Sequence, residues 1–272
     1  MNAASSTSQD KVVLRGANKA FIDRKRRRET TALSDVSLSI PKSRFVCLLG
    51  PSGCGKSTIL NLIAGFEHAT SGKVLLDGNS ITAPGPDRGM VFQQPQLFPW
   101  LNIVDNITFA PRMAGERPEQ YSPRAAQYIQ LMGLTGFEKH YPYELSGGMQ
   151  QRVALARAWI TEPELFLMDE PFGALDAQTR LMMQELLLGV WERSRTTVLF
   201  VTHDIDEALF LADQIVIMTA RPGRIKESLD VELDRPRNYE TIIFNERYIK
   251  LKQHILQVIR KETLQAIELG PV

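Results

Sequence analysis

The sequence predicts an α/β fold with a mainly parallel β-sheet and a helical subdomain inserted into it. Short, continuous apolar runs typical of buried strands recur along the chain, and helical patterns lie between several of them. Strands that alternate with helices imply a parallel sheet that helices cover on both faces. Residues 101–160, in contrast, show mostly helical patterns and no convincing strand.

The first elements lead into a glycine-rich turn. Residues 36–40 alternate between apolar and polar side chains, as a half-buried strand does, and residues 45–49 form a continuous apolar run that ends in glycine. Residues 57–64 then carry apolar side chains at helical spacing. We therefore expect a strand, a turn and a helix in this order.

The remaining elements follow from the same patterns. Further strands are expected at residues 74–76, 90–92, 165–168, 198–201 and 215–218, and helices at residues 179–190 and 204–211. Within the insertion, Pro123 precedes residues 124–132 and Gly133. This order predicts a helix that begins at the proline and ends before the glycine.

The tail of the chain predicts a last helix. Apolar side chains recur every three or four residues within residues 245–267, which is an amphipathic pattern. They are Tyr248, Leu251, Ile255 and Val258. The simpler interpretation is that this helix docks on its own domain, and the alternative is that it binds a partner.

Composition and charge exclude several classes of protein. The chain has 272 residues, of which 43% are hydrophobic, so it can build a core. Its formal net charge of +1 argues against a nucleic-acid footprint over the whole molecule. The polar start has no apolar stretch of a secretory signal, and no apolar run approaches the roughly 18 residues of a spanning helix. Two cysteines exclude a disulfide scaffold and suit a reducing cytosol.

The glycine-rich turn predicts a phosphate-binding loop. Residues 50–57, Gly-Pro-Ser-Gly-Cys-Gly-Lys-Ser, fit the pattern G-x-x-x-x-G-K-[ST] between an expected strand and an expected helix. Glycines let successive backbone N–H groups point at phosphate oxygens, and the helix adds the positive end of its dipole. Lys56 is then placed to reach the β- and γ-phosphates, and the Ser57 hydroxyl to ligate Mg²⁺.

Acidic residues and a histidine follow two other expected strands. Asp169 and Glu170 come directly after residues 165–168, at the end of the strand where parallel sheets bind ligands. Asp169 is placed to hold Mg²⁺, and Glu170 to orient or deprotonate a water that attacks the γ-phosphate. His203 follows residues 198–201 and points toward the same edge.

The motifs together resemble those of a known family. Residues 145–152, Leu-Ser-Gly-Gly-Met-Gln-Gln-Arg, look like the signature motif of the ABC ATPases and lie 24 residues before Asp169, as in that family. Gln93 resembles the Q-loop, residues 174–176 the D-loop and residues 202–204 the switch histidine. The similarity covers about residues 12–228 and implies a P-loop NTPase (RecA-like) core with a small N-terminal antiparallel β portion.

The resemblance also implies a domain organisation and roles for single residues. A polar tail at residues 1–10 would precede one ATPase domain at 11–272, with its core at 11–92 and 161–228, its helical subdomain at 93–160 and a helical extension at 229–272. The implied catalytic residues are Glu170, His203 and Gln93, and the implied Mg²⁺ ligands are Ser57, Gln93 and Asp169. The implied ATP contacts are Phe21, Gly50, Pro51, Ser52, Gly53, Cys54, Gly55, Lys56, Ser57, Thr58, Ser146, Gly147, Gly148 and Asp176.

Three details of these segments carry further expectations. The thiol of Cys54 lies at a helix start beside Lys56, which is expected to favour its thiolate, whereas Cys47 in a buried strand should be inert. Trp159 stands where the family usually has a small residue, which concerns local helix packing. The basic run at residues 24–28 is interpreted as a solvated loop, with contact to anionic lipid headgroups as the alternative.

Two classes of function fit the resemblance: the energy subunit of a membrane importer, and a soluble ABC ATPase that works on nucleic acid or ribosomes. The sequence favours the importer, because the phosphate loop and the signature are close in sequence and the chain carries one cassette without membrane helices. Residues 96–101 and 171–180 resemble the nitrate, sulfonate and taurine branch, although a different small solute stays open.

The importer interpretation implies partners and a location. Two ATPase subunits would form a homodimer that binds an ABC permease and, indirectly, a solute-binding protein. Nucleic acid is not expected as a partner, and the expected location is the cytoplasmic face of the inner membrane.

Overall fold

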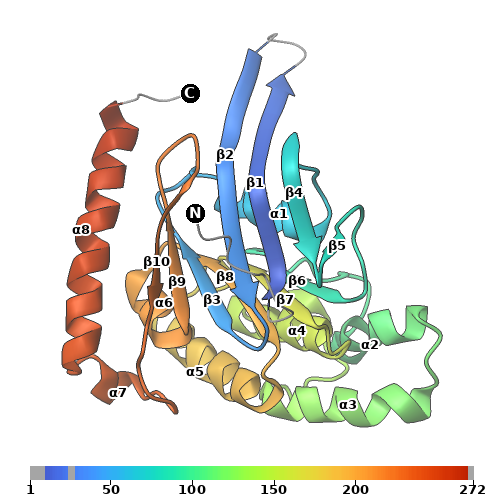
Figure 1. Cartoon of the computed structure of the whole chain (residues 1–272). Helices are drawn as coiled ribbons and strands as arrows, with labels where there is room; N and C mark the ends of the chain where they lie inside the picture. Colours follow the sequence, from blue (N-terminus) through green and yellow to red (C-terminus); the bar gives the residue numbers. More distant parts are fainter. Residues whose placement is uncertain (1–9, 24–27, 269–272) are drawn as a thin grey trace. The chain divides into compact units, whose positions relative to one another are not determined.

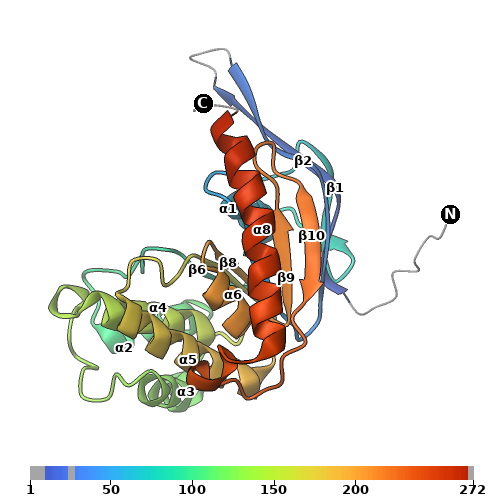
Figure 2. The same ribbon diagram turned by 90° about the vertical axis from the view of Figure 1, so that its left-hand side faces the viewer.

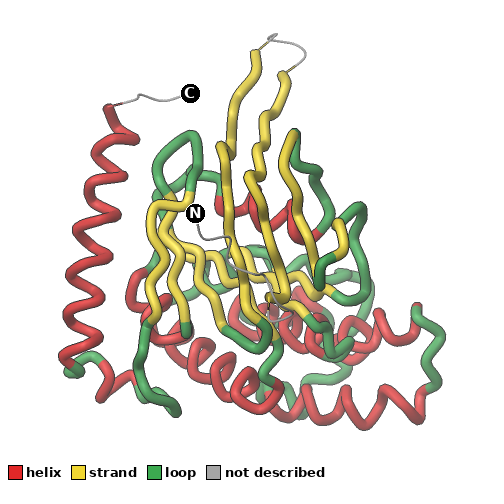
Figure 3. Tube along the Cα trace, viewed as in Figure 1, coloured by secondary structure: helices red, strands yellow, loops and turns green. Residues whose placement is uncertain are grey.

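The computed structural model describes residues 10–23 and 28–268, and the chain divides into two compact units. Unit 1 comprises residues 1–85 and 197–272, and unit 2 comprises residues 86–196. Figure 3 distinguishes the helices from the strands of each unit along the Cα trace. Each unit is described by itself below.

Unit 1 begins with an antiparallel sheet in the order β2-β1-β4-β5 (Figure 1). Its strands are β1 (Asp10–Asp23), β2 (Arg28–Pro41), β4 (Ser71–Leu76) and β5 (Asn79–Ser80). The predicted alternation at residues 36–40 falls within β2, where Val36, Leu38 and Ile40 are buried and the residues between them are exposed. The predicted N-terminal antiparallel portion is therefore confirmed.

The second group of strands in unit 1 lies in the order β10-β9-β3-β8. These are β3 (Phe45–Leu49), β8 (Thr197–Thr202), β9 (Gln214–Met218) and β10 (Ile225–Asp230). Strand β3 pairs in parallel with both β8 and β9, and β10 runs antiparallel to β9. All five residues of β3 are buried, which explains why its sequence is a continuous apolar run rather than an alternating one.

The described residues of unit 1 also form four helices: α1 (Lys56–Ala64), α6 (Ile205–Leu211), α7 (Tyr239–Ile242) and α8 (Glu246–Glu268). Helix α8 runs beside β9 and β10 in Figure 2 and carries the buried Tyr248, Leu251 and Ile255. The Tyr248 hydroxyl donates to Asp206 of α6 at 2.5 Å, and the His254 ring lies 2.9 Å from Glu227 of β10. The helix therefore docks on its own unit, as the simpler interpretation expected.

Unit 2 is mainly helical, with β6 and β7 as its paired parallel strands among the described residues. Its elements are β6 (Arg88–Val91), α2 (Ile103–Met113), α3 (Pro118–Leu131), the 3-10 helix η1 (Pro142–Glu144), α4 (Gly147–Trp159), β7 (Leu165–Asp169) and α5 (Ala177–Ser194).

One predicted helix start in unit 2 was wrong. Helix α3 begins at Pro118, and Pro123 lies inside it. The rule that proline marks the first helical position holds for Pro118, while Pro123 removes one backbone N–H donor from the second turn. The Gln120 side chain accepts from the Arg117 N–H at 2.9 Å, which stabilises the earlier start.

Trp159 fits the core of unit 2. Its side chain is 1% exposed, and its indole stacks on Phe166 of β7 with ring centroids 4.5 Å apart. The unusual residue at this position therefore fills space between α4 and β7 and does not disturb the helix.

Candidate active site

The register of β3 sets the position of the phosphate loop. Leu49, the last residue of β3, pairs with Thr202 of β8 and with Ile217 of β9. The three parallel strands therefore end at the same edge, and the loop that starts at Gly50 leaves the sheet there. His203 follows Thr202 directly, so unit 1 brings this histidine and the start of the loop to one edge, as the sequence predicted.

Glycine is required within the loop. Gly53 and Gly55 have φ angles of 74° and 101°, a left-handed region that residues with side chains rarely adopt. A methyl group on Gly55 would also lie 2.6 Å from Leu33 Cδ2 of β2. Gly55 precedes α1 and has no side chain that could cap it, so the positive end of the helix dipole lies at the loop.

Lys56 is held within the loop. Its side chain is 6% exposed, and its Nζ donates to the carbonyl oxygens of Gly50 at 2.9 Å and Pro51 at 3.2 Å. Phosphate oxygens are stronger partners for an ammonium group than carbonyl oxygens, because the hydrogen bond is then charged at both ends. Ser57 and Thr58 follow in the first turn of α1, where Ser57 is an exposed residue.

The expected reactivity of Cys54 was wrong. Cys54 is 1% exposed. Its Sγ packs against Gly50, where an added methyl group would lie 2.9 Å from the sulfur atom. Burial raises the pKa of the Cys54 thiol, and this outweighs the nearby Lys56 charge, which lowers it. Burial likewise raises the pKa of Cys47 well above its usual value. This agrees with the expectation that the Cys47 thiol is inert.

The residues around His203 hold its backbone in place. The Thr202 hydroxyl donates to Glu207, which is buried, and accepts from the Asp204 N–H at 3.0 Å. Asp204 in turn caps α6 by accepting from the N–H groups of Asp206 and Glu207. His203 itself is exposed, so its imidazole is accessible at the edge where the loop begins.

Phe21 lies on β1 and is 42% exposed. The ammonium group of Lys19 stands 4.8 Å from the centre of its ring, a cation–π contact that the sequence did not indicate. An exposed aromatic face suits stacking on a planar base. Of the basic run at residues 24–28, residues 24–27 lie outside the described residues, so the choice between its two interpretations stays open.

Unit 2 places two of the predicted catalytic residues next to one glycine. Asp169 is the last residue of β7, and Glu170 follows with a φ of 44°. A methyl group on Gly173 would lie 3.6 Å from Gln93 Nε2 and 3.9 Å from Glu170 Cβ. A left-handed backbone is strained for a residue with a side chain.

The signature residues stand at the start of a helix. Ser146 caps α4, and its Oγ accepts from the Met149 N–H at 3.3 Å. Ser146 and Gly147 are exposed, and a methyl group on Gly147 would meet no atom of the described residues within 4 Å. The N-terminal end of α4 is therefore open on this chain, as an anion site completed from elsewhere requires.

Asp176 caps the next helix, α5. Its carboxylate accepts from the N–H groups of Gln178 at 3.1 Å and Thr179 at 3.0 Å. Hydrogen bonds from the Thr179 side chain, and then from the backbone, hold the pKa of Asp176 below its usual value. The Asp176 carboxylate therefore stabilises the first turn of α5 within a single chain.

Arg157 on α4 makes contacts that were not predicted from the sequence. Its guanidinium group donates to the carbonyl oxygens of Gln96 at 2.7 Å and Pro95 at 3.0 Å, and it lies 5.5 Å from the Phe98 ring centre. Helix α4, which begins at the signature motif, thus fixes the position of residues 95–98, just after Gln93. The sequence does contain a signal for this role, because Arg157 is the basic residue in the otherwise apolar run of residues 153–159.

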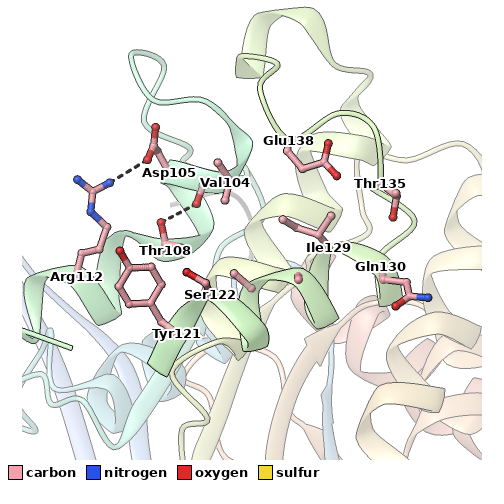
Figure 4. A pocket seen from close by; sticks show the side chains of 12 residues that line it. Val104, Asp105, Thr108, Arg112, Tyr121, Ser122, Ile129, Gln130, Thr135 and Glu138 are labelled. Carbon is pink, nitrogen blue, oxygen red and sulfur yellow. Dashed lines mark hydrogen bonds and ion pairs between the residues drawn. The ribbon is translucent and has the colours of Figure 1, made fainter. Parts of the chain in front are cut away.

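Figure 4 shows a further pocket in unit 2, with a volume of about 560 Å³. Val104 and Thr108 of α2 face Ser122 and Ile129 of α3 across it. None of the motif residues lines this pocket, so it is not the site that the sequence predicted.

Comparison with known proteins identifies the family. Residues 33–173 match the family model described as ABC transporter. A nitrate import ATP-binding protein of Synechococcus elongatus is 49% identical over 84% of both chains. The chain belongs to the ABC transporter family. It is an ABC-type ATPase that binds ATP.

Other relatives and a solved structure agree with this assignment. A taurine import ATP-binding protein of Rhizobium johnstonii is 49% identical over 76% of this chain and 79% of its own length. An aliphatic sulfonates import ATP-binding protein of Bacillus cereus is 42% identical over 95% of this chain and 96% of its own length. A dimeric ATP-binding cassette solved with ADP and phosphate covers 82% of this chain and all of its own, with 32% identity and a TM-score of 0.71.

The fold expected of this ABC cassette, a P-loop NTPase core with a mainly parallel sheet and helices, is confirmed. Among the described residues, every helix is too short or too polar to span a bilayer.

We predict that both native cysteines resist N-ethylmaleimide in the folded ATPase at pH 8. Each thiol is buried and has a raised pKa, so the reactive thiolate is both scarce and shielded. Mass spectrometry should find labelling of Cys47 and Cys54 only after denaturation. A Ser80→Cys variant, with a thiol on the exposed strand β5, should label readily and serves as the control. Rapid labelling of Cys54 in the folded protein would contradict the buried geometry.

Proposed function

We propose that this chain is the energy-coupling ATPase subunit of an importer for small oxyanionic solutes: taurine, another sulfonate or nitrate. The observation that carries the proposal is the agreement among relatives, since proteins named for nitrate, taurine and aliphatic sulfonate import are each more than 40% identical to it. These three kinds of solute share a compact group of oxygen atoms that carries negative charge.

In the proposed site, the loop at residues 50–58 binds the phosphates of ATP. The N–H groups at the start of α1 and the Lys56 ammonium face the charge of the β- and γ-phosphates. The exposed Phe21 ring stacks on the adenine.

Hydrolysis is assigned to residues at strand ends. A water attacks the γ-phosphorus, Glu170 accepts its proton, and the bond to ADP breaks, which leaves inorganic phosphate. His203 and Gln93 contact the γ-phosphate and the attacking water. Mg²⁺ suits the donors assigned to it, because Ser57, Asp169 and Gln93 offer only the oxygen ligands that this ion prefers. When bound, Mg²⁺ neutralises charge on the phosphates.

We further propose that two copies of the chain complete each site. The open start of α4, with Ser146, Gly147 and Gly148, would face the γ-phosphate held by the second copy, and Asp176 would lie at the same interface. The dimeric form of the solved cassette bound to ADP and phosphate supports this arrangement.

A permease is the proposed membrane partner. A groove of about 560 Å³ in unit 2 is lined by Phe92, Phe98 and Phe109, among others, and Arg157 also lines it. Trp100, from the segment after Gln93, is 70% exposed. An exposed aromatic surface of this kind marks a protein interface, and its position after Gln93 would link permease movement to the catalytic residues. The subunit would then lie at the cytoplasmic face of the membrane, with a solute-binding protein on the opposite side.

The importer role can be tested in proteoliposomes that contain the ATPase, its permease and the matching binding protein. We expect nitrate, taurine or an alkanesulfonate to stimulate ATP hydrolysis, because solute capture is coupled to the ATPase cycle. Glucose and leucine serve as control solutes. Stimulation by neither nitrate, taurine nor a sulfonate would rule out the proposed solute class.

We predict that Glu170→Gln keeps ATP binding and lowers kcat by about a hundredfold or more, because the attacking water loses its proton acceptor while the side chain keeps its size. Steady-state hydrolysis and calorimetry with ATP provide the two measurements. Lys56→Ala is the contrasting variant, and it should weaken ATP affinity itself by about tenfold or more. Wild-type turnover in Glu170→Gln would remove Glu170 from the assigned role.

We predict that a mixed dimer of a Lys56→Ala chain and a Ser146→Arg chain traps one nucleotide. If sites form between chains, both lesions fall in one site and the other site keeps all its parts. Vanadate trapping per purified mixed dimer measures the outcome, with each mutant homodimer as the control. Two trapped nucleotides, or none, would contradict the shared site.

A further inference from the structure

The loop between β9 and β10 braces the phosphate loop from its outer side. Arg221 Nε donates to the Gly53 carbonyl oxygen at 2.6 Å. The same loop is attached to β2, because the Gly223 N–H donates to the Ala32 carbonyl at 2.9 Å and the Ser34 N–H donates to the Gly223 carbonyl at 3.0 Å. Arg221 thus reaches the phosphate loop from a segment that is anchored on a strand.

The Arg221 contact determines the orientation of one peptide group in the phosphate loop. A peptide group is planar, so its carbonyl oxygen and the following N–H point in opposite directions. With the Gly53 oxygen directed outward to Arg221, the Cys54 N–H is directed inward, where it lies 3.3 Å from the Pro51 carbonyl oxygen. Gly53 has a φ of 74° and no side chain, so this peptide is held by two hydrogen bonds, one from Arg221 to its carbonyl oxygen and one from its N–H to Pro51.

Helix α8 holds the bracing loop in turn. The Glu262 side chain is 2% exposed, and its Oε2 accepts from the Ala220 N–H at 3.0 Å. Its Oε1 lies 3.1 Å from the Nζ of Lys226 on β10. A carboxylate this deeply buried is costly unless it is paired. Here Lys226 pairs its charge, and its hydrogen bond to Ala220 holds the residue directly before Arg221. All these residues belong to unit 1.

We propose that Arg221 is a positioning residue of the ATPase, which orients the Gly53–Cys54 peptide for phosphate binding, and that Glu262 of α8 keeps Arg221 in place. This inference rests on the nucleotide site proposed above. The C-terminal helix therefore affects ATP affinity without touching ATP. Neither residue belongs to the motifs of the sequence analysis.

The first test compares three arginine variants. Arg221→Ala should raise the KM for ATP about tenfold with kcat nearly unchanged, because a misoriented loop loses phosphate contacts shared by the ground and transition states. Arg221→Lys should restore most of the affinity, since the contact with Gly53 uses one donor nitrogen. Arg224→Ala is the matched control, because the guanidinium group of this neighbouring arginine donates to the Ser34 side chain at 3.1 Å rather than to the phosphate loop. Its KM should stay at the wild-type value.

Hydrogen exchange adds a readout at the loop itself. In the nucleotide-free protein, Arg221→Ala should speed amide exchange in the peptide that covers residues 50–57, while the melting temperature stays near that of Arg224→Ala. A KM for Arg221→Ala equal to that of Arg224→Ala would overturn the proposal. A fall in melting temperature with loss of kcat and no rescue by lysine would also overturn it, because that pattern indicates general destabilisation.

The second test addresses the link to α8. Glu262→Gln keeps an oxygen acceptor for the Ala220 N–H and should stay near the wild-type KM, whereas Glu262→Ala should raise KM in the same direction as Arg221→Ala. The double variant should bind ATP no more weakly than Arg221→Ala alone, since both changes release the same peptide. Additive effects, or a wild-type KM in a folded Glu262→Ala, would overturn the link.

Lys56→Ala separates failure of this inference from failure of the nucleotide site. If Lys56→Ala loses ATP affinity while Arg221→Ala keeps it, the site stands and the bracing role is wrong. If neither variant changes ATP affinity, the proposed site is itself wrong, and the inference fails with it.

Discussion

The parallel pairing of β3 with β8 and β9 is the constraint on which the rest of unit 1 depends. Leu49 lies beside Thr202 and Ile217, so the three strands end together. One edge of the sheet thereby receives the phosphate loop after β3, His203 after β8 and the bracing loop after β9. A shift of one residue in this register would separate these groups and turn the buried side chains of β3 to the opposite face.

The proposed phosphate binding at this edge relies mainly on backbone N–H groups. The surrounding side chains accordingly bond the carbonyl groups of the loop. Gly53 and Gly55 take left-handed angles so that N–H groups turn inward, and their carbonyl groups then need partners elsewhere. Arg221 supplies one such partner, and Lys56 bonds two other carbonyl oxygens of the loop. Side chains in this region therefore serve to hold peptide groups in one orientation.

Local patterns were sufficient for most elements. The loop at residues 50–57 is recognisable because its chemistry needs glycines and a lysine at set spacing, and β3 because a strand buried on both faces must be continuously apolar. The start of α3 was misplaced because two prolines compete for the same helical signal, and the Gln120 contact with Arg117 that accompanies the earlier one has weak sequence specificity.

The sequence by itself determined the family and the fold class, and it predicted the groups proposed to face the nucleotide, because these depend on residue types at short spacing. Only the tertiary structure decided the state of Cys54, which depends on how deeply its side chain is buried beneath Gly50. It also decided the contacts of Arg221 and Glu262, which meet partners 168 and 42 residues away in the sequence. Contacts over such separations depend on how strands and helices pack, and no short pattern encodes them.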